Sequence, residues 1–395
     1  MARRPAALAL ALAAGLAAVA LAAWAFGSGG AQRNPGVAAS QSLAAASPTP
    51  TATPTPRPTP PRAPRPTPRY LTAATNGVRL PLSQRERATR QPIVVMVDDH
   101  PAARPQSGIS QAEVVYHALA EGGIPRYMLV FQVNDASVIG PVRSTRLYFL
   151  DWATEWRPLY AHVGGAPNAM QRLRAINGRL AWDADEHRWG GRYFWRIRAR
   201  RAPHNTYAST TALRGLARRL GSRARFDRSP WTFIPETPLA KRPGSGGLVV
   251  AYRHNVVTYR YDRRTNRYLR GVTGARLQRD LATRRVVAPA NVVVLFTQTA
   301  PLRDSPGAGD NEKKLRIDIR TVGTGRALVM RNGEVIAARW SKASATAPTR
   351  LTYASGCRAG QPVGLVPGQI FIQVVPASMR LSPTGRVPRE DSCPR

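Results

Sequence analysis

The feature that most constrains this chain is a run of apolar, mostly β-branched residues at 93–97. The run ends directly in Asp98-Asp99-His100, and a second short apolar run at 159–163 leads into a Gly-Gly pair. Short buried strands followed by polar, glycine-marked loops are how α/β folds place functional groups at strand ends. The chain is therefore predicted to contain an α/β region whose functional site lies at the ends of these strands.

The remainder of the N-terminal half alternates helical and strand patterns. Apolar residues at helical spacing predict helices at 146–156, 166–176 and 210–220. The segment 114–133 is predicted to form a hairpin, and a helix over 110–120 stays open as an alternative. Ser110 and Glu113 fit a capping box, which predicts at least one helical turn before the hairpin.

The C-terminal half has only strand patterns. Alternating apolar runs predict strands at 249–252, 256–261, 292–296, 327–330, 334–340 and 370–375. Asn332-Gly333 between two of these runs is a strong hairpin signal. The predicted fold class is therefore an α/β (α+β) N-terminal domain with a mixed sheet at 71–235, a linker at 236–247, and a smaller β-rich domain at 248–380.

The first 70 residues indicate a membrane tether and a stalk. Arg3 and Arg4 precede an apolar run at 6–26, so residues 1–31 are predicted to be a signal peptide or a signal anchor. Residues 32–70 are of low complexity and become rich in Pro and Thr, which favours an extended, disordered stalk. The rest of the chain is expected outside the cytoplasm, anchored in the cytoplasmic membrane or secreted if the segment is cleaved.

Two cysteines follow, Cys357 and Cys393. In an extracytoplasmic protein a single pair most simply forms one disulfide, which here would tie down a C-terminal tail at 381–395. The alternative is a metal site, but it would need more ligands, and no histidine follows His254.

The formal net charge of +36 is almost entirely due to arginine, since only four of the 58 basic residues are lysine. Such a surface would suit a polyanion, but the same bias arises from a general drift toward arginine with no partner implied. The arginines are scattered, and no nucleic-acid-binding module is present. Nucleic acid is therefore not an expected partner.

Several motifs occur in one order along the chain: Val95-Met96-Val97-Asp98, His100-Pro101, Ala103-Arg104-Pro105-Gln106-Ser107-Gly108, Glu121-Gly122-Gly123, Gly140-Pro141-Val142-Arg143-Ser144, His162-Val163-Gly164-Gly165, Arg201-Ala202-Pro203-His204-Asn205, Pro348-Thr349-Arg350 and Pro367-Gly368-Gln369. With these motifs, residues 77–376 resemble the YerB-type bacterial envelope proteins, domain of unknown function 3048. The resemblance implies a two-part layout and an extracytoplasmic site, but no reaction. Many such proteins resemble lipoproteins, whereas this chain lacks the lipidation cysteine, and Asp99 stands where they usually carry Asn.

The candidate site residues come from these motifs. If the protein is an enzyme, the expected catalytic residues are Asp98, His100 and His162, which follow the two predicted strands. The expected ligand-binding residues are Arg104, Gln106, Glu121, Arg126, Arg143, Arg146, Gly164, Gly165, His204 and Asn205. Arginines suit carboxylate or phosphate, and the Gly-Gly pair would let a ligand approach the backbone.

The sequence leaves three functions open. The leading hypothesis is a tethered protein that binds an anionic or glycan envelope ligand, or a membrane or wall protein. The second is a hydrolase acting on envelope glycan or peptide, with a divalent cation held by Asp98, Asp99, His100 and His162 as a conceivable variant. The third is a structural scaffold in which these residues are internal braces. No cofactor is predicted, and no known nucleophile, zinc or phosphate-loop motif is present.

Overall fold

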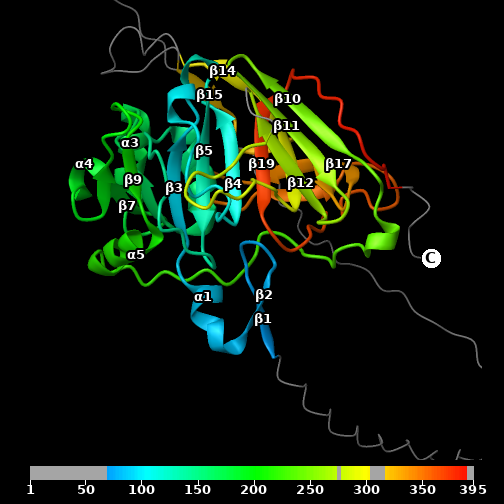
Figure 1. Cartoon of the computed structure of the whole chain (residues 1–395), viewed down its shortest axis with the longest axis horizontal. Helices are drawn as coiled ribbons and strands as arrows, with labels where there is room; N and C mark the ends of the chain where they lie inside the picture. Colours follow the sequence, from blue (N-terminus) through cyan, green and yellow to red (C-terminus); the bar gives the residue numbers. More distant parts are fainter. Residues whose placement is uncertain (1–68, 274–276, 303–315, 389–395) are drawn as a thin grey trace, which may run out of the picture. The chain divides into compact units, whose positions relative to one another are not determined.

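The computed structural model describes residues 69–273, 277–302 and 316–388 (Figure 1). The predicted tether, nearly all of the stalk and Cys393 lie outside these residues, so the anchor and the disulfide stay predictions. Within the described ranges, no helix is both long enough and apolar enough to cross a membrane.

The core of the fold is one mixed sheet of ten strands. In spatial order its strands are β7 (Trp182–Asp185), β6 (Leu159–His162), β3 (Ile93–Asp98), β5 (Pro125–Phe131), β4 (Val114–Leu119), β19 (Ile370–Pro376), β13 (Asn291–Thr297), β16 (Gly323–Arg331), β17 (Glu334–Lys342) and β18 (Arg350–Tyr353). Strands from the N-terminal and C-terminal halves meet where β4 and β19 pair in parallel, in the centre of Figure 1. One continuous sheet therefore contains strands from both predicted domains. The boundaries of those domains stay a prediction.

The directions of the strands determine which of their ends lie together at one edge of the sheet. β3 pairs in parallel with β6, and β5 is antiparallel to both β3 and β4. β4, β19 and β13 are parallel to one another in turn, and β7 is parallel to β6. All of these strands except β5 therefore run in one direction, and their carboxyl ends lie along one edge of the sheet. This confirms the predicted mixed sheet, in which the strands that contain the apolar runs at 93–97 and 159–163 are parallel neighbours.

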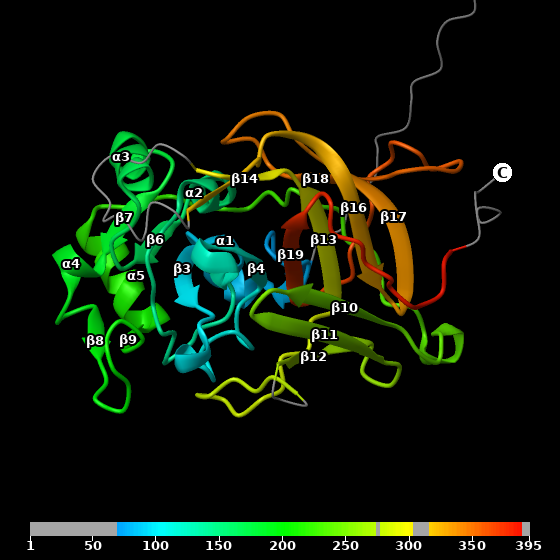
Figure 2. The same cartoon turned by 90° about the horizontal axis from the view of Figure 1, so that it is seen from above.

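Helices and a second sheet cover the two faces. On one face, α2 (Leu147–Ala153), the short 3-10 helix Thr154–Trp156 and α3 (Pro167–Ile176) pack against the even-numbered side chains of β3, such as Val94 and Met96. On the other face, Val95 and Val97 join a core with α5 (Thr210–Arg219) and a three-stranded sheet. That sheet comprises β10 (Gly247–Tyr252), β11 (Asn255–Asp262) and β12 (Arg267–Val272), and it lies beside β13 and β16 in Figure 2.

Smaller elements complete the described chain. They are α1 (Arg85–Thr89), α4 (Glu186–Trp189), the pairs β1 (Tyr70–Thr72) with β2 (Arg79–Pro81), β8 (Phe194–Arg196) with β9 (Thr206–Ala208) and β14 (Thr299–Pro301) with β15 (Ile317–Ile319), and the 3-10 helices Leu82–Gln84, Pro101–Ala103, Glu121–Gly123 and Leu239–Lys241.

Most predicted elements are confirmed, including the hairpin of β16 and β17 around Asn332-Gly333. The segment 114–133 forms the β4–β5 hairpin, so the alternative helix over 110–120 is wrong. The capping box is also wrong. The Glu113 carboxylate turns away from Ser110 and accepts hydrogen bonds from the backbone N–H groups of Gln132 (2.7 Å) and Asn134 (2.6 Å).

Candidate functional site

Asp98, the last residue of β3, lies at the centre of a group of side chains from three separate segments. Its Oδ2 accepts a hydrogen bond from His204 Nδ1 (2.7 Å) and forms an ion pair with Arg143 Nε (3.2 Å). Its Oδ1 accepts from the backbone N–H of His100 (3.0 Å). We call Asp98, His100, Arg143 and His204 the Asp98 cluster.

Local structure brings these residues together. Asp98 ends a strand, and His100 caps the 3-10 helix Pro101–Ala103, because its Nδ1 accepts from the Ala102 N–H (3.2 Å). His204 lies just before β9, and its loop is tied to the loop after β3 because Arg200 donates to the carbonyls of Ala103 and Pro105. Residues distant in sequence thus meet at the carboxyl end of β3.

The cluster reaches solvent through His204 and Arg143. The Asp98 side chain is only 4% exposed, whereas the side chains of His204 and Arg143 are 17% and 26% exposed. The imidazole rings of His100 and His204 stack with centroids 4.7 Å apart. Partial burial, together with the charges of His204 and Arg143, holds the pKa of His100 below its usual value. Because Asp98 accepts from Nδ1 of His204, the Nε2 atom of that ring is left for a ligand, to which it donates when the ring is protonated and from which it accepts when the ring is neutral.

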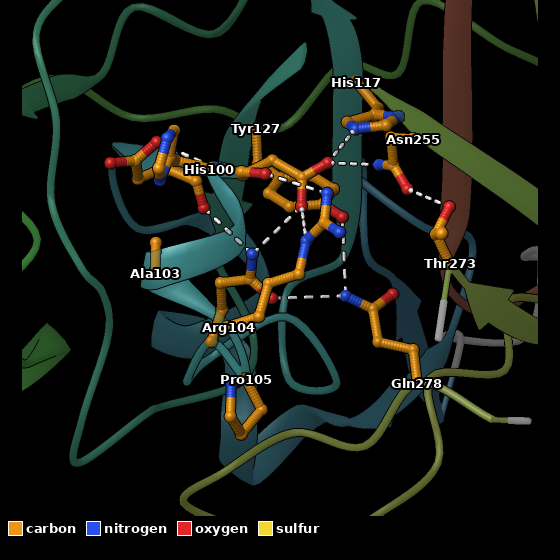
Figure 3. A network of polar contacts seen from close by, with 12 residues as sticks. His100, Ala103, Arg104, Pro105, His117, Tyr127, Asn255, Thr273 and Gln278 are labelled. Carbon is orange, nitrogen blue, oxygen red and sulfur yellow. Dashed lines mark hydrogen bonds and ion pairs between the residues drawn. The ribbon is translucent and has the colours of Figure 1, made fainter. Parts of the chain in front are cut away.

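Asp99, the next residue, is fully buried and belongs to a second network of polar contacts, whose members Arg104, His117 and Asn255 are labelled in Figure 3. Its Oδ1 accepts from Arg104 Nε (3.0 Å) and Gln106 Nε2 (3.1 Å). Its Oδ2 contacts His117 Nε2 (2.9 Å) and accepts from Asn255 Nδ2 (2.7 Å). We call these five residues the Asp99 network. Asn255 begins β11, so the network joins the three-stranded sheet to the edge of the large sheet.

Charge compensation for Asp99 comes from a buried arginine as well as from Arg104. Arg270 on β12 is fully buried and donates to the hydroxyls of Tyr259 (3.2 Å) and Tyr127 (3.1 Å). Burial opposes ionisation of Asp99, but the hydrogen bond from His117 and the charges of Arg104 and Arg270 outweigh it. The pKa of Asp99 therefore lies below its usual value.

The contacts of His117 indicate which of its nitrogens carries the proton. Burial lowers the pKa of His117, which favours the neutral ring. A neutral ring that donates from Nε2 to Asp99 must accept at Nδ1, where Arg270 Nη2 (3.5 Å) and the Gln373 side-chain amide lie. Placing the NH2 group of Gln373 toward Nδ1 also gives that buried amide nitrogen a partner. His117 is thus a buried brace.

Glu121, Arg126 and Arg146 form an ion cluster next to the Asp98 cluster, since Asp98 and Arg126 are cross-strand partners. Glu121 pairs with Arg146 Nε and lies 3.6 Å from Arg126 Nη2. Burial of Glu121 opposes ionisation, but the two guanidinium charges lower its pKa to about 2. Burial, aided by the charge of Arg146, lowers the pKa of Arg126 to about 10. Both arginines are therefore engaged within the protein.

His162 lies apart from the Asp98 cluster. It is buried, with Nε2 2.9 Å from Asp183 and Nδ1 2.8 Å from the Gly164 carbonyl. β3 and β6 pair only as far as Val95 and Ala161. Beyond that point the segment 142–145 inserts between them, because the Arg143 N–H bonds to Met96 and the Val163 N–H bonds to the Arg143 carbonyl.

The other predicted residues make structural contacts. Gly165 packs so closely on Thr145 that an added Cβ would lie 2.5 Å from its methyl group, and the Gly164 N–H donates to Asp185 (2.8 Å). Asn205 accepts from Arg196 (3.2 Å) within the β8–β9 hairpin. The four residues considered for a cation are also divided, since Asp99 turns to His117 and His162 to Asp183. In the described ranges, no group of three or more His, Cys, Asp or Glu side chains is arranged to hold a metal ion.

Sequence reasoning missed Asn255 of the Asp99 network, the nearby buried residues Arg270 and Gln373, and the buried Glu113. One signal for Arg270 was available. In the alternating pattern of β12 it occupies the same inward-facing register as Tyr268 and Val272, a position that normally holds an apolar residue. No comparable signal marks Asn255 or Gln373, whose contacts depend on strands far apart in sequence.

Comparison with known proteins agrees with this architecture. The models for the N-terminal and C-terminal domains of the family described as "Protein of unknown function (DUF3048)" match residues 80–223 and 248–372. A Bacillus subtilis (strain 168) protein named "Putative lipoprotein YerB" is 31% identical over 320 residues, which cover 78% of this chain and 88% of that protein. The crystal structure of YerB protein from Bacillus subtilis is similar with a TM-score of 0.67 and 27% identity, over 80% of this chain and 99% of that chain. This chain belongs to the DUF3048 family.

Proposed function

We propose that this protein is held at the outer face of the cytoplasmic membrane and binds an anionic or glycan ligand of the cell envelope through the Asp98 cluster. The tether is supported by the basic and apolar N-terminal segment, by the Pro- and Thr-rich stretch after it, and by the similarity to a protein named as a lipoprotein. Because no cysteine precedes Cys357, the proposal places the apolar segment, rather than a lipid, in the membrane.

One observation carries the binding proposal: a single buried carboxylate holds two partly exposed nitrogen-bearing side chains, those of Arg143 and His204. Asp98 fixes Arg143 through Nε, so the two terminal nitrogens of that guanidinium remain for a ligand. It also fixes His204 through Nδ1, which leaves Nε2 for the same ligand. Side chains fixed in this way lose little conformational freedom on binding, so they suit recognition of a phosphate, carboxylate or sugar hydroxyl.

The experiment is a thermal-shift screen of the full-length protein in detergent against poly(glycerol phosphate), polygalacturonate and chitin oligosaccharides. A ligand of the native state raises the melting temperature, and the expected shift is lost in Arg143→Ala. Arg260→Ala, which removes an exposed arginine on β11, is the matched control and keeps the shift. A shift that survives Arg143→Ala would refute the site. If none of the three probes shifts the wild type, the proposal fails in favour of a protein partner or a scaffold.

A hydrolase is the second candidate, and the 2.7 Å contact between Asp98 and His204 favours it. A carboxylate on Nδ1 orients the imidazole so that Nε2 can act as general base toward a water molecule. Under this hypothesis Asp98→Asn and His204→Gln each abolish release of reducing ends or free amines from envelope glycan or peptide, while binding of the same substrate persists. Equal loss of binding and turnover would instead support the binding role alone.

A further inference from the structure

A second cluster of arginines surrounds a cavity at the same edge of the sheet, but at its C-terminal half. The cavity has a volume of about 160 Å³, which is room for more than one water molecule. Its walls come from the ends of β13, β17 and β19, from the start of β16 and from the segment between β15 and β16. The lining residues are Phe296, Gln298, Arg320, Gly325, Arg326 and Trp340, with Thr297, Thr324 and Ala377.

Contacts among the lining residues hold the walls of the cavity in place. Trp340 Nε1 donates to the Phe296 carbonyl (2.8 Å), which fixes the indole ring against β13. A Cβ at Gly325 would lie 2.3 Å from that same nitrogen, so only glycine lets β16 pass this close to the ring. Arg326 lies over the Phe296 ring, with its guanidinium carbon 3.9 Å from the ring centroid. The Phe296 ring beneath the Arg326 guanidinium and the Trp340 indole held against β13 are therefore fixed parts of the cavity wall.

The charge at this cavity is uncompensated within the described residues. None of its lining residues is acidic, and neither Arg320 nor Arg326 is paired with a carboxylate there. Arg326 is exposed, and the hydrogen bond recorded for its side chain among the described residues is a 3.5 Å contact with the Met379 carbonyl. Across the β16–β17 ladder it is paired with Arg339, also exposed, and like charges in that position repel each other. A bound anion would relieve this repulsion.

We propose that this cavity is a second anion-binding site, which takes a small phosphate or carboxylate group. Arg320 and Arg326 would bind its oxygens, and Gln298 would donate to them from the strand end. The site is separate from the Asp98 cluster, because β13 lies four strands from β3 in the sheet, or about 19 Å at ~4.8 Å per strand. The inference does not depend on the function proposed for that cluster.

The test is isothermal titration calorimetry of the full-length protein in detergent with inorganic phosphate and, separately, with galacturonate. The wild type is expected to bind at least one of them, and Arg326→Gln is expected to weaken that binding at least about tenfold. Arg260→Gln, which removes the same charge from the exposed face of β11, is the matched control and leaves binding unchanged. Whether phosphate or galacturonate binds shows whether the site takes a phosphate or a carboxylate group.

Arg143→Gln separates this site from the Asp98 cluster. Loss of binding in Arg326→Gln but not in Arg143→Gln supports the second site, whatever happens to the proposed function. Loss in Arg143→Gln alone would place the anion at the Asp98 cluster and overturn the inference. Absence of binding of both anions to the wild type would also overturn it. Because Arg326 is exposed, its variant is expected to keep the melting temperature of the wild type, and Arg320→Gln provides a second variant that removes the other guanidinium.

Discussion

Asp98 and Asp99 are consecutive carboxylates at the end of one strand, yet their surroundings differ in nearly every respect. Successive side chains of a strand point to opposite faces, so Asp98 faces the side of α2 and α3 and Asp99 faces the three-stranded sheet. Both carboxylates are buried, but the Asp98 partners Arg143 and His204 both reach solvent, whereas Arg104 alone does so among the partners of Asp99. The other partners of Asp99 tie two sheets together. Two neighbouring aspartates at one strand end therefore have different roles. Asp98 belongs to a candidate site on one face, and Asp99 is a structural brace on the other.

The largest expected effect comes from removing the brace. Asp99→Ala leaves the donors of Arg104, His117 and Asn255 unpaired and the charge of Arg270 uncompensated. Removing one partner from a buried charged network costs about 3–5 kcal/mol in the free energy of unfolding. Urea denaturation measures this loss.

Asp99→Asn provides the matched comparison. It keeps one acceptor oxygen for Arg104 and Gln106, so it should lose less stability than Asp99→Ala. Asp227→Ala, at an exposed aspartate, should change stability by less than about 0.5 kcal/mol. A loss below about 1 kcal/mol in Asp99→Ala would contradict the assignment of Asp99 as a brace.

Glu113 sharpens the comparison because it is equally buried but has no cation in direct contact. Its carboxylate accepts two backbone N–H bonds, and burial outweighs them and raises its pKa to about 7. The folded state therefore holds a proton that the unfolded state releases between pH 4.5 and about 7. The contribution of Glu113 to the free energy of unfolding is fully present below pH 4.5. It falls by up to about 3 kcal/mol as the pH rises through 7.

Glu113→Gln tests this pH dependence, because glutamine does not titrate. The difference in unfolding free energy between variant and wild type should shift in favour of the variant by up to about 3 kcal/mol from pH 5 to pH 8. Exposed Glu86→Gln serves as the control and should show a constant difference. A constant difference in Glu113→Gln as well would show that other interactions offset the burial of the Glu113 carboxylate, so that its pKa is not raised.

Glu121 should show the opposite sign, because two arginines lower its pKa to about 2. Its contribution is present above pH 4.5 and is lost as the pH falls toward 2. Allowing for the one-fifth exposure of its side chain, Glu121→Gln should cost about 2 kcal/mol at pH 7 and nothing near pH 2. Unfolding curves at the two pH values measure this. A pH-independent cost would mean that Arg126 and Arg146 are not held by this carboxylate and are free to bind ligand.

The sequence predicted the strands at 93–97 and 159–163 because both are local runs followed by clear breaks, and the structure pairs them in parallel. It also led to Asp98, His100, Arg143 and His204, which the structure brings together. It did not separate His162 from them, because the segment 142–145 that enters between β3 and β6 has no periodicity of its own.

The roles of Arg104 and Gln106 were equally out of reach. Both are polar residues in a loop, and only the position of β11 and β12 above that loop turns them into braces of Asp99. The continuity of the large sheet depends on the pairing of β4 with β19, about 260 residues apart, which no local pattern encodes. Local sequence patterns thus predict the helices and strands. Pairing between strands far apart in sequence decides which polar residues face each other.

The smallest expected effect on stability completes the comparison. Asp98→Asn combined with His100→Ala removes the charge and one ring of the Asp98 cluster, but Arg143 and His204 lie near enough to solvent to be hydrated instead. The loss in unfolding free energy should be below about 1 kcal/mol, while ligand binding or turnover at the cluster is abolished. Thermal denaturation and the thermal-shift screen measure the two effects on the same preparation. A large fall in melting temperature would place Asp98 with Asp99 as a brace, and the distinction between the two faces of β3 would then fail.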